Sequence, residues 1–129
     1  MKKLFAYTAL IVASTCCPSF AQNSSCDLLK DYEELATSSF RNEPTQKPPG
    51  ASECWVQDSA YWCEWEMDSK SQARQEFVQF FGDVKACFPS AEATRIRQTS
   101  TSGFVTTTKA EFYVTYSSHD VSLSVERVD

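Results

Sequence analysis

The sequence predicts an α+β fold in which two helices pack on one face of an antiparallel sheet of about five strands, held by two disulfides. Two stretches carry apolar residues at helical spacing, and the segments that follow them alternate between apolar and polar residues, in the order α-β-β-α-β-β-β. Four cysteines lie within or beside these elements. An even number of cysteines in a short exported chain is typical of a disulfide-bonded domain.

Residues 1–21 have the pattern of a secretory signal peptide. Two lysines near the N-terminus precede an uncharged, mostly apolar stretch at residues 4–13, and Ser19 and Ala21 provide the small side chains of a cleavage site. The apolar stretch is shorter than the roughly 20 residues that cross a bilayer, so we expect no membrane anchor.

Cleavage after Ala21 leaves residues 22–129, a length typical of one domain, in the periplasm or outside the cell. The alternative is lipidation of Cys16, which would hold the protein at a membrane surface. The preceding residues argue against it, because Ala13 and Thr15 are not the residue types usual before a lipidated cysteine.

The chain is acidic, with 17 Asp and Glu residues against 12 Lys and Arg residues and a formal net charge of −5. Loss of the two signal-peptide lysines makes the mature domain more acidic. Such a surface repels nucleic acid and anionic lipid, and it attracts basic proteins. We therefore expect no nucleic-acid partner and treat a basic protein as the candidate partner, although acidity also serves solubility alone. The composition does not indicate an oligomeric state.

A first helix is expected over residues 25–40, with Ser24 or Ser25 as its N-terminal cap. Its apolar residues recur on one face at helical spacing: Leu28, Tyr32, Leu35 and Ala36. Three prolines and a glycine within residues 41–53 are incompatible with regular structure. This segment is therefore expected to be a surface loop.

Residues 54–67 alternate in polarity and predict a β-hairpin. With a two-residue turn at Asp58 and Ser59, Trp55 lies opposite Trp62. The inner face then carries Val56, Tyr61, Trp65 and Met67 beside two cysteines. The outer face carries Trp55, Trp62, Glu64 and Glu66.

A second helix is expected after Ser69, which forms a capping box with Gln72, and Pro89 ends it. Its apolar residues share one face: Ala73, Phe77, Phe80, Phe81, Val84, Cys87 and Phe88. This helix is expected to pack its aromatic face on the sheet.

Three strands are expected at the C-terminal end. Residues 92–98 form a polar edge strand, and a Ser/Thr/Gly loop separates it from strands near residues 107–117 and 120–128. A turn at Ser118 and His119 joins the last two. The residues that this turn pairs all share one face: Tyr116 with Val121, Val114 with Leu123, and Phe112 with Val125.

The four cysteines are expected to form two structural disulfides, since their spacing matches neither a redox CxxC pair nor a zinc knuckle. We favour Cys63–Cys87, which would join the hairpin to the second helix, together with Cys26–Cys54. The alternative joins Cys54 to Cys63 across the hairpin and Cys26 to Cys87, because the turn places the first two opposite each other.

A set of short motifs resembles small exported bacterial domains of uncharacterised function. The set comprises a helix beginning Cys26-Asp27-Leu28, a Pro/Gly loop before Cys54, Tyr61-x-Cys63-x-Trp65, and an amphipathic helix ending Ala86-Cys87-Phe88. The resemblance covers most of the mature chain. It implies an architecture and a compartment, and it assigns no functional residue.

Catalytic chemistry has little support in the sequence. The single histidine, His119, lies in a predicted turn, and the predicted disulfides leave no thiolate nucleophile. Glu64 and Glu66 share a strand face and could form an acid pair or a calcium site, but two solvated carboxylates are the simpler explanation. No nucleotide-binding or metal-binding motif occurs. We therefore expect a non-enzymatic domain without cofactor or metal.

Trp55 and Trp62 are the most informative side chains for function. If they lie exposed beside Glu64 and Glu66, they form a binding patch for a basic protein or a glycan. If the first helix or the proline-rich loop covers them, they belong to the core.

The leading hypothesis is a protein-binding domain, in its sharper form an inhibitor or immunity protein against a basic hydrolase or toxin. The opposing hypothesis is a small-ligand carrier or an enzyme that uses carboxylates.

Overall fold

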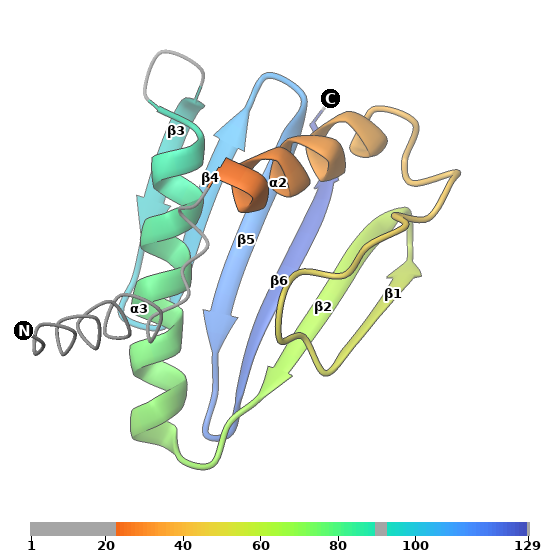
Figure 1. Cartoon of the computed structure of the whole chain (residues 1–129). Coiled ribbons are helices and arrows are strands. Elements are labelled where there is room, and N and C mark those ends of the chain that lie inside the picture. Colours follow the sequence, from red (N-terminus) through yellow and green to blue (C-terminus); the bar gives the residue numbers. More distant parts are fainter. Residues whose placement is uncertain (1–22, 90–92, 129) are drawn as a thin grey trace, which may run out of the picture.

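In the part of the chain that the structure describes, six antiparallel strands form one sheet, and two helices cover one of its faces (Figure 1). The computed structural model describes residues 23–89 and 93–128, so the predicted signal peptide at residues 1–21 lies outside the described residues. The elements in chain order are α2 (Asn23–Ala36), β1 (Glu53–Gln57), β2 (Ala60–Glu66), α3 (Lys70–Cys87), β3 (Ala93–Gln98), β4 (Ser102–Thr107), β5 (Ala110–Tyr116) and β6 (Asp120–Arg127). The predicted α+β class, with both helices on one face, is confirmed.

The strand order across the sheet is β1-β2-β6-β5-β4-β3. Strand β3 is therefore an edge strand, as its polar sequence predicted. The sheet has one strand more than the five expected, because part of the Ser/Thr/Gly stretch forms β4 instead of a loop. Gly103 within β4 lies under Phe81 of α3, where a Cβ atom would come within 2.5 Å of the ring. Helix packing, and not a turn, therefore explains this glycine.

Both predicted hairpin registers are confirmed. Trp55 pairs with Trp62 across β1 and β2, and Asp58 and Ser59 form the tight turn with φ values of 54° and 66°. Positive φ at both central residues is the signature of a type I′ turn, whose twist matches that of the strands. In β5 and β6 the pairs are those that the apolar pattern predicted: Tyr116 with Val121, Val114 with Leu123, and Phe112 with Val125.

Helix α3 begins and ends where its caps predict. The Ser69 hydroxyl accepts the backbone N–H of Gln72 at 3.1 Å, and the Gln72 side chain accepts the N–H of Asp68 at 2.8 Å. The buried face consists mainly of aromatic and small residues: Ala73, Phe77, Phe80, Phe81 and Val84. Each large apolar side chain buried there contributes roughly 1.5–3 kcal/mol to folding.

Helix α2 ends four residues before the predicted residue 40. Ser39 and Phe40 adopt positive φ values of 56° and 55°, and the Phe40 N–H donates to the Leu35 carbonyl. This turn directs Phe40, only 3% exposed, into the core, where it stacks on Tyr61. The buried face of α2 is correspondingly rotated from the predicted one, since Leu29 is fully buried and Leu28 is only partly so.

The disulfides follow the alternative pairing, so the favoured one was wrong. Cys54 is joined to Cys63 and Cys26 is joined to Cys87. Cys54 and Cys63 are direct cross-strand neighbours, with Cα atoms 4.1 Å apart. Helix α3 packs over β4, β5 and β6, so Cys87 meets the start of α2 and not β2. Each disulfide stabilises the fold by reducing the entropy of the unfolded chain. This effect is about 4 kcal/mol for Cys26–Cys87, whose cysteines are 61 residues apart, and about 3 kcal/mol for Cys54–Cys63, whose cysteines are 9 residues apart.

Candidate functional site

The sheet face opposite the helices is the strongest candidate for a functional surface, and we call it the open face. Both helices lie on the other side of the sheet (Figure 1). Strand pairing places one residue from each strand in a single row across the open face. From edge to edge, this row consists of Trp55, Trp62, Ser124, Tyr113, Phe104 and Arg97.

The two tryptophans at one end of this row are half-buried and lie directly opposite each other. The Trp55 indole N–H donates to the Gln57 side-chain carbonyl at 3.0 Å, and that of Trp62 donates to the Gln57 backbone carbonyl at 3.1 Å. One residue therefore satisfies both indole donors. The polar groups of the rings are occupied, and what they offer to a partner is aromatic surface.

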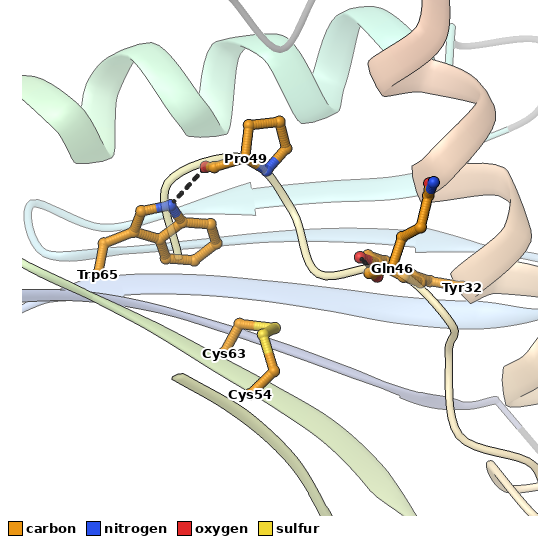
Figure 2. The surroundings of a disulfide bond; sticks show 6 residues. All are labelled: Tyr32, Gln46, Pro49, Cys54, Cys63 and Trp65. Atoms are coloured by element: carbon orange, nitrogen blue, oxygen red, sulfur yellow. Dashed lines mark hydrogen bonds between the residues drawn. A yellow bond between two sulfur atoms is a disulfide. The ribbon is translucent and has the colours of Figure 1, made fainter. Parts of the chain in front are cut away.

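The proline-rich loop lies on the other side of the sheet. The indole N–H of Trp65 donates to the Pro49 carbonyl at 3.0 Å, above the Cys54–Cys63 disulfide (Figure 2). Trp65 is 5% exposed and packs on Phe80, so it is the core tryptophan. The outer placement of Trp55 and Trp62, expected from strand alternation, is what the structure has.

The other end of the row carries residues that the sequence reasoning missed. Phe104 stacks on Tyr113 with ring centroids 4.5 Å apart, and the Arg97 guanidinium lies 4.2 Å from the Phe104 centroid. Arg97 also forms an ion pair with Glu111 at 3.6 Å. The alternation of residue types along β4 and β5 could have placed Phe104 and Tyr113 on this face. That inference requires β4 to be recognised as a strand, which the sequence did not allow.

Carboxylates surround the aromatic row. Glu64 is half-buried and Glu66 is exposed, and both point to the open face as predicted. The register sets three like-charge pairs directly across strands: Glu53 with Glu64, Glu66 with Asp120, and Glu111 with Glu126. Like charges in such positions destabilise a sheet. One carboxylate oxygen of Asp120 is also buried without a hydrogen-bond partner among the described residues.

Two tyrosines of the core, Tyr32 and Tyr61, have structural roles. Burial raises the pKa of the Tyr32 hydroxyl, which donates to the Gln46 carbonyl at 2.7 Å beneath the loop. Burial also raises the pKa of Tyr61, whose ring lies 5.0 Å from that of Tyr32. His119 is exposed in its turn, with Nδ1 3.2 Å from the Ser118 hydroxyl. Within residues 23–89 and 93–128, no group of three His, Cys, Asp or Glu side chains could hold a metal ion.

A hollow of about 340 Å³ lies between α2 and residues 42–46. It is lined by Leu28, Tyr32 and Leu35, with Asp31 and Glu34 contributed by the same helix. The hollow is on the helix side of the molecule, so it adds nothing to the open face.

No helix of the described chain has the length and apolar character that crossing a membrane requires. Comparison with protein-family models, with curated proteins and with solved structures gives no match to this chain. The open face is therefore the feature of the molecule from which a function can be inferred.

Proposed function

We propose that this chain is an exported, disulfide-bonded domain that binds another protein through the open face of its sheet. The observation that carries the proposal is the row of half-buried aromatic side chains on that face: Trp55, Trp62, Tyr113 and Phe104. Tryptophan and tyrosine are the residues that most often dominate binding energy at protein interfaces, because they bury a large area at little entropic cost.

The proposed partner is a basic protein. The chain carries a net charge of −5, and the open face itself bears Glu53, Glu64 and Glu66 around the tryptophans. Charge of this kind accelerates encounter with a cationic protein and disfavours other partners. In its sharper form, the proposal is an inhibitor or immunity protein that blocks a basic hydrolase or toxin.

The proposed compartment is the periplasm or the exterior of the cell. Two disulfides are compatible with an oxidising environment, in which such bridges form and persist. The signal-peptide pattern of residues 1–21 points the same way.

Site-specific photo-cross-linking in the producing cell tests the binding face. A benzophenone side chain placed at Ser122, on β6 of the open face, is expected to form a covalent adduct with a second protein. The matched control is Val78, which is 58% exposed on the opposite side of the molecule, on α3. Adducts that form from Val78 and not from Ser122 would contradict the proposal, as would the absence of adducts from both.

A further inference from the structure

The two ends of the aromatic row are built from the same kinds of side chain, and only one of them holds a cation. At the β3 end, Arg97 lies over the Phe104 ring at 4.2 Å and pairs with Glu111 at 3.6 Å. An aromatic ring and a carboxylate thus hold one guanidinium group between them. This arrangement combines a cation–π contact with a charge-assisted ion pair.

At the β1 end, the aromatic and acidic components recur without the cation. Trp55 and Trp62 face each other, and Glu53 and Glu64 form the next pair on the same face, two residues along each strand. Among the described residues, no ion pair and no cation–ring contact involves any of these four side chains. The open-face positions of β1, β2 and β6 contain no lysine or arginine.

We propose that this end of the open face is a subsite for a cationic side chain, an arginine in particular, that the protein partner supplies. The inference rests on the proposed function and specifies what the partner must present. A guanidinium group is planar, so it can stack on an indole face while it donates to a carboxylate. It would occupy here the place that Arg97 occupies at the other end.

Two features prepare the subsite for that ligand. Gln57 accepts both indole N–H groups, which holds the rings in place before the partner arrives. Glu53 and Glu64 repel each other across the strands in the free protein, and a cation between them would relieve that repulsion. The free domain thus bears an electrostatic cost that binding removes.

Charge distinguishes an arginine-bearing partner from the two other possible occupants. An uncharged glycan would stack on the tryptophans but would leave Glu53 and Glu64 uncompensated. A second copy of the chain carries the same net charge of −5 and would be repelled, and its Arg97 is already held by Glu111 and Phe104.

The direct test is a titration of the disulfide-bonded chain, followed by NMR of the indole N–H signals of its three tryptophans. The probe is a short peptide with two arginines, and the control is the same peptide with citrulline, an uncharged isostere of arginine. The arginine peptide is expected to shift the Trp55 and Trp62 signals and to leave that of Trp65 unchanged. Equal shifts with the citrulline peptide, or shifts confined to other residues, would overturn the inference.

Matched variants separate the subsite from net charge. Glu53→Gln with Glu64→Gln is expected to weaken binding of the arginine peptide about tenfold. Asp31→Asn with Glu76→Gln removes the same charge from exposed positions on the helices and should change the affinity less than twofold. Equal losses in both pairs would show that only overall acidity attracts the peptide, and the subsite would be wrong.

The outcomes also separate the subsite from the proposed function. One such outcome is that Ser122 cross-links to a partner with equal yield in the Glu53→Gln/Glu64→Gln variant and in the native chain. That result would support the binding face and contradict the cation subsite. Two other results would overturn the subsite: indole shifts with an uncharged oligosaccharide but not with the arginine peptide, and a dimer of the free chain that these two substitutions dissociate.

Discussion

The three tryptophans occupy two different environments, and this difference can be tested one residue at a time. Trp65 is buried among Phe80 and the proline-rich loop, whereas Trp62 is half-buried on the open face. Trp65→Ser should therefore cost about 3–5 kcal/mol of unfolding free energy, the usual range for truncation of a core aromatic. Trp62→Ser should cost less than half of that. Urea denaturation measures both, and equal losses would show that Trp62 is a core residue.

Tyr32 should make the fold sensitive to alkaline pH. Its pKa is raised by burial, so the folded hydroxyl stays protonated above pH 10, where an exposed tyrosine ionises. Above that pH the unfolded state gains stability by releasing a proton that the folded state keeps. Its contribution is therefore complete below about pH 10 and is lost progressively above it.

Tyr32→Phe should remove this part of the pH dependence. The loss of the hydrogen bond to the Gln46 carbonyl should cost about 1 kcal/mol at neutral pH. Urea unfolding at pH 8 and at pH 10.5 measures both effects. Identical pH slopes for the variant and the native chain would contradict the assignment.

At the scale of elements, the contact between α3 and β4 depends on a glycine. A Cβ atom at position 103 would lie 2.5 Å from the Phe81 ring, whereas one at Gly82 of α3 would meet nothing within 4 Å. Gly103→Ala should destabilise the protein by about 1–3 kcal/mol through overpacking. Gly82→Ala should stabilise it by about 1 kcal/mol, because alanine favours the helix. Chemical denaturation measures the unfolding free energy of both variants. If Gly103→Ala leaves it unchanged, the Phe81 ring does not lie against position 103.

The β1–β2 hairpin should become more stable when its acidic pair is neutralised. Glu53 and Glu64 face each other, and relief of such a contact is worth about 0.2–1 kcal/mol. Glu53→Gln with Glu64→Gln should therefore raise the melting temperature, while the same substitutions weaken arginine binding. Gains of stability with losses of function are typical of binding sites. A lower melting temperature in this variant would show that the pair is structural.

For the whole molecule, local signals determined how far the sequence could predict the fold. The register of both hairpins followed from turn chemistry and residue alternation, because the residues that carry these signals are close together in the sequence. The disulfide pairing required knowing that α3 lies over β4 to β6, which is a tertiary fact. Strand β4 was missed because its serine, threonine and glycine residues resemble a loop. Gly103 is required by the contact with Phe81 of α3, which is distant in the sequence.

The candidate site was predictable to a similar extent. The alternation of residues in the β1–β2 hairpin was enough to place four side chains on an outer face: Trp55, Trp62, Glu64 and Glu66. The Arg97–Phe104–Glu111 arrangement could not, because it joins three strands whose registers depend on β4. The comparison between the two ends of the open face, on which the cation subsite rests, therefore needed the structure.

At the scale of the whole molecule, we propose that the open face is the place where a basic protein binds. The most direct measurement immobilises three chains: the native domain, Trp55→Ser/Trp62→Ser and the helix-side control Val78→Ser. The exported proteins that each chain recovers are then compared at low and at high salt. The native domain and Val78→Ser should recover the same basic protein in a salt-sensitive manner, and the double tryptophan variant should lose it. Undiminished recovery by a folded Trp55→Ser/Trp62→Ser variant would show that the open face does not bind this protein.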